Sequence, residues 1–268
     1  MSSTALSSVY AVCSDAAGVA GNIFAFVLFL SPIPTFRRII RNESTEQFSG
    51  MPYICALLNC LICLWYGMPL VKPGVILVAT VNSTGAVFQL IYICIFIRYA
   101  AKPMKLKMLG FLISVFAIFA LIVFVSLRFL DSPSRQLFVG YLSVASLVSM
   151  FASPLLVIVS SSQFLIYIST LQTAEFLLTY VVFCTFPCKN LVIKMRSVEY
   201  MPFSLSLATF LMSLAFYVYG MFKHDAFICV PNGIGTVLGT VQLALQLRLN
   251  TSGVNVIIVV DPQKNQTH

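Results

Sequence analysis

The chain carries very little charge for its length. Only 9% of its 268 residues are charged, whereas a soluble domain usually carries roughly 25% charged residues. Hydrophobic residues make up 59% of the chain, and the mean hydropathy is +0.96. So few polar side chains cannot cover a water-exposed surface. The composition therefore excludes a soluble protein and predicts a membrane protein with no separate soluble domain.

Motifs for catalysis and metal binding are lacking as well. No HExxH sequence and no paired acids lie in the apolar runs, so we expect no enzyme, no metal site and no cofactor. Cys60 and Cys63 form a CxxC, but no His lies near them, and buried thiols are the better interpretation. Asp15 and Asp225 lie only at the edges of apolar runs. The spans therefore offer no deep acid, which a proton-driven carrier normally needs.

Long apolar runs dominate what is present. A helix needs about 20 apolar residues to cross a bilayer, and seven runs fit: 16–36, 53–71, 75–97, 108–128, 137–158, 203–222 and 226–247. We predict an all-α membrane protein with seven transmembrane helices, in direct contact with the lipid bilayer. No Lys or Arg precedes the first run, so we do not expect a cleaved signal peptide.

The Lys and Arg residues predict which way the chain is inserted. Four lie on one side of the predicted spans and twelve on the other, in the loops after the first, third and fifth runs and in the tail. Positive charge stays in the cytoplasm during insertion, so the N-terminus is expected on the non-cytoplasmic side. The net charge of +8 thus follows from topology, and we expect no nucleic-acid partner.

The sequence repeats itself once. The matched segments are LSPIPTF with ASPLLVI, SGMPY with EYMPF, WYGM with VYGM, and VNSTGAV with PNGIGTV. Pro52 and Asn82 are 30 positions apart, and so are Pro202 and Asn232. We predict two three-helix repeats at 10–100 and 135–248, a linker helix at 101–130, and a cytoplasmic tail at 249–268. Because the linker adds one crossing, the repeats are parallel, in a 3+1+3 arrangement.

Several longer motifs are highly specific: AGNIFAFVLFLSPIPTF, STEQFSGMPY, LLNCLICLWYG, SVEYMPFSLSL and DAFICVPNGIG. On these motifs the chain resembles the SWEET family of plant sugar transporters over about residues 10–158 and 190–245. The resemblance implies a bidirectional, facilitative uniporter for glucose or related mono- and disaccharides, working by alternating access. It also implies a plasma or vacuolar membrane, with a weak leaning to the vacuole, and a homo-oligomer, often a trimer.

Asn82 and Asn232 lie at equivalent positions of the two repeats, each inside an apolar run. An unpaired amide in hydrocarbon costs several kcal/mol, so each must face a neighbouring helix or a polar cavity. A lone membrane Asn commonly bonds to another helix, but a pair related by a repeat axis converges where repeat transporters hold their substrate. Carboxamides both donate and accept, which suits sugar hydroxyls. The resemblance implies that both bind substrate.

The resemblance implies further roles that the residues alone do not reveal. Cys63 and Phe216 match pocket positions, although both would pass for ordinary core and many relatives have Trp in place of Phe216. Tyr66 and Asp225 match an extracellular gate; an interfacial Tyr and a solvated loop Asp are the alternative. Four prolines match a cytoplasmic ring of hinges, where simple helix termination is the alternative: Pro32, Pro52, Pro154 and Pro202.

Two other classes of seven-helix protein fit less well. A receptor would need no internal repeat, and the DRY and NPxxY signatures of receptors are absent. A related exporter of amino acids would be expected to carry PQ dipeptides and buried acids, but the one PQ lies in the tail at Pro262 and Gln263.

The stretch 159–189 breaks the repeat. Pro32 and Pro52 are 20 positions apart, but Pro154 and Pro202 are 48 apart. Its apolar run, 162–186, is long enough for one membrane crossing and too short for two. One extra crossing would invert the orientation of the last two spans. We therefore predict an apolar helical insertion from an altered transcript that impairs the transporter; an unusual functional loop is the alternative. The changed tail, with NVIIVV at 255–260, favours the first interpretation.

Overall fold

The computed structural model describes residues 3–46, 48–159 and 203–251. Within these residues it is entirely helical, which confirms the predicted all-α class. The helices are α1 (Ser3–Leu30), α2 (Ile33–Arg41), α3 (Met51–Gly67), α4 (Ile76–Tyr99), α5 (Lys102–Arg128), α6 (Ser132–Val159), α9 (Phe203–Phe222) and α10 (Ala226–Thr251). Apart from Val159, the predicted insertion at 159–189 lies outside the described residues.

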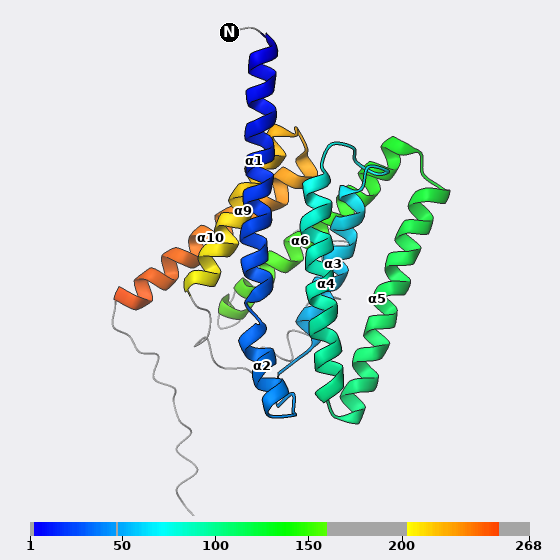
Figure 1. Ribbon diagram of the computed structural model, residues 1–268, viewed down its shortest axis with the longest axis vertical. Coiled ribbons are helices and arrows are strands. Elements are labelled where there is room, and N and C mark those ends of the chain that lie inside the picture. The colour runs from blue at the N-terminus through cyan, green and yellow to red at the C-terminus, as the bar shows by residue number, and fades with distance from the viewer. Residues whose placement is uncertain (1–2, 47, 160–202, 252–268) are drawn as a thin grey trace, which may run out of the picture.

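Each of the seven predicted spans coincides with a helix or helix pair. Within the described part of the chain, five helical segments have the length and apolar composition to cross a membrane: Ser7–Arg41, Ile76–Tyr99, Lys102–Arg128, Ser204–Phe222 and Ala226–Ala244. Met51–Gly67 is apolar but shorter. The first span differs most from its prediction, because α1 begins at Ser3 and projects beyond the other helices in Figure 1. We call that end, which also carries the α3–α4 and α9–α10 loops, the N-terminal end of the bundle.

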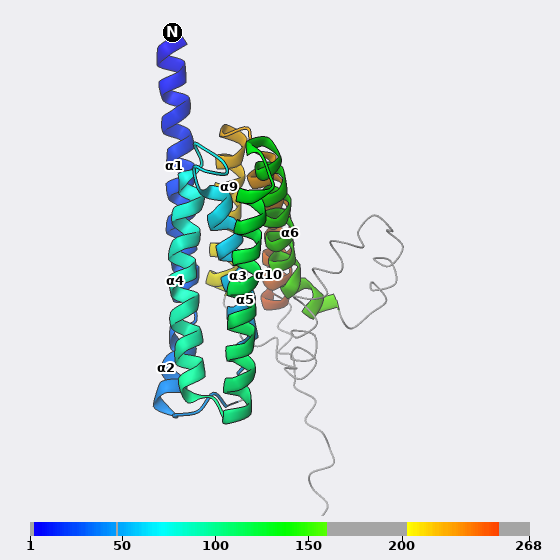
Figure 2. The same ribbon diagram turned by 90° about the vertical axis from the view of Figure 1, so that its right-hand side faces the viewer.

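The helices pack in a symmetric pattern. In one half α4 packs against α1 and α3, and in the other α10 packs against α6 and α9. Across the two halves, α1 packs against α9 and α3 against α6. Exchanging α1 with α6, α3 with α9 and α4 with α10 thus preserves every one of these pairs. Figure 2 shows α1 and α4 on one side of the bundle and α6 on the other.

Glycines let the second and third helices of each half approach closely. A Cβ added at Gly67 of α3 would lie 2.5 Å from the Ala79 backbone nitrogen of α4. A Cβ added at Gly220 of α9 would lie 2.7 Å from the Cys229 backbone nitrogen of α10. Real Cβ atoms do not approach backbone so closely, so only glycine permits either crossing.

The linker helix α5 lies at one edge of the bundle (Figure 1) and packs mainly against α3. Trp65 Nε1 donates to Ser126 Oγ at 3.1 Å. The Arg135 guanidinium donates to three backbone carbonyls around the same corner, those of Leu70, Ser126 and Leu130. Arg135 is one of the four basic residues expected on the non-cytoplasmic side. Its guanidinium supplies donors to carbonyls that lack partners near the ends of helices.

Candidate functional site

A central cavity of about 90 Å³ lies between the two halves of the bundle. Six helices line it: α1, α3 and α4 from one half, and α6, α9 and α10 from the other. The lining residues are Ala25, Phe29, Asn59, Cys60, Cys63, Tyr66, Val78, Val81, Asn82, Ser143, Leu147, Met150, Met212, Phe216, Phe227, Ile228 and Asn232. All four predicted substrate-binding residues are therefore brought together. Ligand pockets usually measure roughly 300–1,000 Å³, so this conformation is a narrow one.

The two predicted asparagines have the same local geometry. Asn82 Nδ2 donates to the Val78 carbonyl and Asn232 Nδ2 to the Ile228 carbonyl, each at 2.8 Å and each four residues earlier in its own helix. Neither Oδ1 accepts a hydrogen bond from any described group. A carbonyl oxygen that can accept two bonds is therefore left open on each side of the cavity.

Cys63 and Phe216 stand on the facing helices α3 and α9. Their exposed fractions are only 5% and 6%, so both are packed into the cavity wall. A Cβ added at Gly21 would lie 2.7 Å from the Phe216 ring. Glycine at this position of α1 therefore makes the space in which the Phe216 ring lies.

Tyr66 and Asp225 meet at the N-terminal end of the cavity. The Tyr66 hydroxyl donates to the Asp225 carboxylate and lies 2.9 and 2.8 Å from its two oxygens. The Phe227 backbone N–H also donates to this carboxylate, at 2.9 Å. Asp225 is 3% exposed, so it is not the solvated loop acid of the alternative interpretation. The contact joins α3 to the start of α10.

The four prolines are described unequally. Pro32 is the N-cap of α2, directly after the break that ends α1, and Pro52 lies in the first turn of α3. Both remove a backbone donor where the helix has no partner for it. Pro154 lies within α6, but its side chain is outside the described residues, and Pro202 lies outside them altogether. Their shared hinge role stays a prediction.

The structure adds a residue to the cavity that the sequence reasoning missed. Asn59 of α3 is 5% exposed, and its Oδ1 accepts a hydrogen bond from Ser146 Oγ of α6 at 2.7 Å. Cys63 Sγ donates to the same Oδ1 at 3.7 Å. The signal was present in LLNCLIC, because a carboxamide in an apolar run must find partners there just as Asn82 must.

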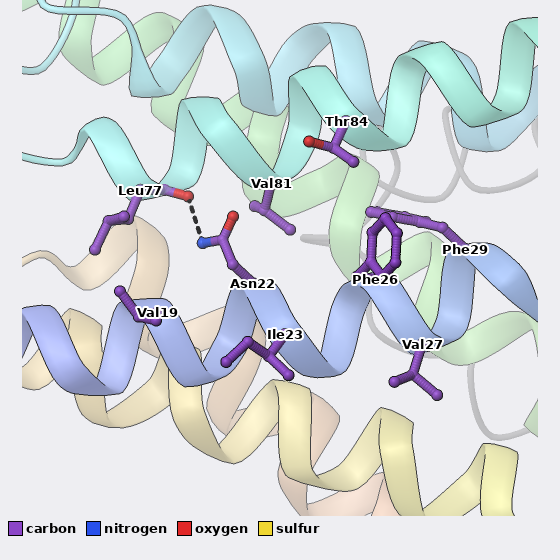
Figure 3. Close-up of a pocket in the computed structure, with 9 residues that line it drawn as sticks. All are labelled: Val19, Asn22, Ile23, Phe26, Val27, Phe29, Leu77, Val81 and Thr84. Atoms are coloured by element: carbon purple, nitrogen blue, oxygen red, sulfur yellow. Dashed lines mark hydrogen bonds between the residues drawn. The ribbon is translucent and has the colours of Figure 1, made fainter.

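A larger hollow of about 440 Å³ lies between α1 and α4, and Phe29 and Val81 line both this hollow and the central cavity. Figure 3 shows its mostly apolar lining and the bond from Asn22 Nδ2 to the Leu77 carbonyl, at 3.0 Å. Thr80 Oγ1 donates to Asn22 Oδ1 at 3.1 Å, so the amide is satisfied within the protein. Neighbouring Ile23 and Val27 are 59% and 51% exposed. This hollow is therefore a groove on an apolar outer face and lacks the open polar groups of the central cavity.

Comparison with known proteins identifies the family. A sequence profile described as "Sugar efflux transporter for intercellular exchange" matches residues 15–104 and 167–252. The second match begins inside the predicted insertion and leaves α6 out. A solved structure of a eukaryotic SWEET transporter is 48% identical, with a TM-score of 0.74, and the match covers 91% of this chain and 99% of that chain.

Three plant relatives are similar over most of their length. The bidirectional sugar transporter SWEET2a of Sorghum bicolor is 56% identical over 87% of this chain and 84% of its own. SWEET2 of Arabidopsis thaliana is 56% identical over 87% and 86%, and SWEET2b of Oryza sativa subsp. japonica is 50% identical over 90% and 91%. The apolar spans and these matches make the chain an integral membrane protein, and it belongs to the SWEET family of sugar transporters.

Proposed function

We propose that this protein moves glucose or related mono- and disaccharides across a membrane in both directions. The observation that carries the proposal is the pair of open carbonyl oxygens, Asn82 Oδ1 and Asn232 Oδ1, which face one cavity from opposite halves of the bundle. Sugars are uncharged and rich in hydroxyls, so neutral acceptors can hold them without an ion. The relatives that bear the name of bidirectional sugar transporters support the same function, and with it a role other than catalysis.

The remaining cavity side chains fit a sugar ring. Phe216 offers an aromatic face for the C–H side of the ring, and Cys63 is small enough to leave room for it on the facing helix. Ser143 lies in the same wall, where its hydroxyl donates to the Gly140 carbonyl. The narrow cavity must widen before a hexose enters, so the structure corresponds to a closed state of the transport cycle.

Alternating access then uses the two ends of the bundle in turn. At the N-terminal end, the Tyr66–Asp225 bond is the outer gate, which is closed here. At the opposite end, Pro32 and Pro52 weaken the helix ends, and together with Pro154 and Pro202, their matches in the second repeat, they serve as hinges for opening to the cytoplasm. The two halves rock about the substrate site between them.

Transport is facilitative in this proposal. Within the described spans the one acid is Asp15 of α1, which is exposed and pairs at 3.5 Å with Lys223 of the α9–α10 loop, at the N-terminal end of the bundle and not deep between the spans. Without a deep acid there is no group to carry a proton with the sugar. The N-terminus lies on the non-cytoplasmic side of the plasma or vacuolar membrane, and the protein assembles with copies of itself, as a trimer by family resemblance.

The test is glucose flux in yeast cells that lack hexose transport. The chain is expected to equilibrate labelled glucose with or without a protonophore, and Asn82→Ala or Asn232→Ala is expected to abolish uptake at unchanged surface abundance. Asn42→Ala, which changes an exposed Asn in the loop after α2, is the matched control. Normal uptake by a well-expressed Asn232→Ala protein would refute the site, and flux that collapses with the protonophore would refute uniport.

A further inference from the structure

Helix α1 ends at a break where a tyrosine of α4 contacts its last turn. At the break the Ser31 N–H donates to the Leu28 carbonyl at 3.1 Å, three residues back, and Pro32 has no N–H to donate. In a continuous helix the Phe29 carbonyl would accept from the N–H four positions later. Here it accepts from the Tyr92 hydroxyl, at 2.6 Å. A side chain of α4 thus satisfies a carbonyl that the end of α1 leaves open.

The same tyrosine also contacts the helix on the other side of the break. Its ring stacks on that of Phe36 in α2, with the ring centroids 4.5 Å apart and an angle of 22° between the planes. Tyr53, the residue after Pro52, packs edge-on against Phe36 at 5.0 Å. Tyr92 and Phe36 are 3% and 2% exposed. Tyr92 therefore holds the angle between α1 and α2 by two contacts, a hydrogen bond to the first helix and a ring contact with the second.

Helix α2 is held mainly by α4. Among the described helices, α4 is the one against which α2 packs extensively, and Figure 1 shows α2 beside the end of α4 that lies away from the N-terminus. Bending at the break would move Phe36 relative to the Phe29 carbonyl, and one rigid ring cannot follow both. The two Tyr92 contacts therefore stabilise the present angle over other angles.

The described part of the second repeat is built differently at this point. Helix α6 passes Pro154 without a break. Ten residues after Asn232, where the first repeat has its tyrosine ten residues after Asn82, the second repeat has Gln242. The Gln242 amide donates to Ser206 Oγ of α9 at 2.9 Å. Within the described residues, a side chain that bridges a helix break is therefore a feature of the first repeat.

We propose that Tyr92 is a positioning residue for transport: its two contacts form a latch that holds the hinge of the first repeat, and the latch must release before the cytoplasmic end opens. The inference rests on the proposed function. A weaker latch raises the fraction of molecules that are open to the cytoplasm. Asn82 lies ten residues earlier on α4, about 15 Å along the helix axis. The helix that carries a sugar acceptor thus also carries the latch.

The competing explanation is that Tyr92 is a fixed strut, which keeps both contacts in every state of the transport cycle. Removing a strut lowers the stability of the protein but favours neither side of the membrane. Removing a latch opens the cytoplasmic end more often and leaves the Tyr66–Asp225 contact at the other end closed. The side from which the cavity becomes accessible therefore separates the two explanations.

The experiment measures how fast a membrane-impermeant thiol reagent labels Cys63 of the full chain, in inside-out and in right-side-out vesicles. Tyr92→Phe removes the hydroxyl and keeps the ring. Labelling from the cytoplasmic side is expected to rise roughly two- to tenfold, about the effect of one hydrogen bond, and labelling from the other side is expected not to rise. Phe36→Leu, which removes the ring contact and keeps the hydroxyl, is expected to change labelling in the same one-sided way.

Two controls make the comparison specific. Tyr53→Phe removes a hydroxyl from the same group of rings, and this hydroxyl makes no hydrogen bond within the described residues, so labelling is expected at the wild-type rate. Cys63→Ser in each background corrects for the other cysteines.

The outcomes separate the latch from the function. If Tyr92→Phe and Phe36→Leu reach the membrane and labelling is unchanged, or rises equally from both sides, Tyr92 is a strut and the inference is wrong. A rise from the cytoplasmic side alone would establish the latch. The labelling needs no sugar, so a wild-type chain that fails to move glucose would refute the proposed function while the hinge contact is still tested.

Discussion

The two halves of the cavity carry the same residue at one pair of equivalent positions and different residues at two other pairs. Asn82 and Asn232 are identical and equally oriented. On the neighbouring helices, Asn59 and Cys63 lie eight and four residues before Gly67, where Met212 and Phe216 lie eight and four before Gly220. One wall is therefore small and polar, and the other large and apolar. A sugar has a polar edge and apolar faces, so a site built from a symmetric fold must lose symmetry at these positions to fit it.

The glycine contacts also show where the repeats differ in length. α3 has 17 residues and α9 has 20, but the loop 68–75 is longer than the loop 223–225. The two changes compensate, because Asn82 follows Gly67 by 15 positions and Asn232 follows Gly220 by 12. The spacing from Pro to Asn is 30 in both repeats, but the glycine at which the two helices cross lies 3 positions later in the second repeat. Sequence spacing would pair Cys63 with Ser213, whereas the helix crossing pairs it with Phe216.

The largest effect is expected from making the two walls alike. Cys63→Phe places a second ring in a cavity of about 90 Å³, and overpacking of this kind costs roughly 1–3 kcal/mol even where neighbours can move. We expect initial glucose uptake to fall at least about tenfold at equal surface abundance. Cys94→Phe, on an exposed position of α4, is the control.

The reciprocal double variant sharpens this test. If Cys63 and Phe216 are equivalent, Cys63→Phe combined with Phe216→Cys should recover part of the lost uptake, since the total volume is restored. Wild-type uptake by Cys63→Phe alone would show that Cys63 does not face the sugar path.

A second prediction tests the glycine alignment itself. Gly67→Ala and Gly220→Ala should each destabilise the protein by roughly 1–3 kcal/mol, because each Cβ meets backbone that cannot move aside. Thermal unfolding in detergent measures the change. Gly110→Ala, in α5 with nothing within 4 Å of its Cβ, should be neutral or slightly stabilising. A tolerant Gly220 beside a sensitive Gly67 would break the proposed equivalence.

The gate has only a partial symmetric copy. Tyr219 is the counterpart of Tyr66, but its hydroxyl donates to the Gly74 backbone carbonyl, at 3.5 Å, and not to a carboxylate. Tyr66→Phe removes the hydroxyl that holds the buried Asp225 carboxylate, and a bond to a charged group contributes roughly 1.5–3 kcal/mol. The N-terminal end should open more often, so an impermeant thiol reagent added outside should label Cys63 about tenfold faster. Tyr66→Phe with Cys63→Ser corrects for Cys13 and Cys94, which are already exposed. Unchanged labelling would mean that the bond does not control access.

Sequence reasoning located most of the fold because apolar length and positive charge are local signals. The sequence predicts all seven spans and the positions of Asn82 and Asn232, and with the family resemblance it also predicts the Tyr66–Asp225 pair. Asn59 does not stand out in the sequence, because its counterpart in the second repeat is Met212 and the repeat therefore does not mark it. The pairing of Cys63 with Phe216 could not be predicted from the spacing either, because the longer α9 and the shorter α9–α10 loop leave the distance from Pro to Asn unchanged.

The predicted insertion offers a further contrast between the repeats. α6 packs against α3 and α10 as α1 packs against α9 and α4, so it holds the place of a first helix. The family profile instead begins its second match at residue 167. Deleting 159–189 should raise uptake several-fold if the stretch is a damaging insertion, because it removes apolar chain with no counterpart in the first repeat. Equal transport would show that it is tolerated, and lost transport would show that it belongs to the repeat.

The smallest effect is expected at an ion pair of the first repeat. Arg38 donates to both carboxylate oxygens of Glu46, at 2.9 and 2.6 Å, and Asn42 adds a third bond at 2.7 Å. Six residues before Pro202, as Glu46 is before Pro52, the second repeat has Arg196 instead. The hydrogen bonds from Arg38 and Asn42 lower the pKa of Glu46. The stabilisation they give is present above the ordinary Glu pKa of roughly 4.3 and is lost as the pH falls through the lowered value.

Glu46→Gln should therefore lower Tm slightly at pH 7, and its difference from the wild type should shrink as the pH is taken below 4 or so. The effect stays small because the pair is exposed and screened by water and salt. Glu43→Gln is the matched control, since Glu43 lies in the same loop and its carboxylate has no hydrogen bond or ion pair within the described residues. A Tm difference that grows in acid would mean that Glu46 is stabilised in its protonated form, contrary to the geometry of the Arg38 contact.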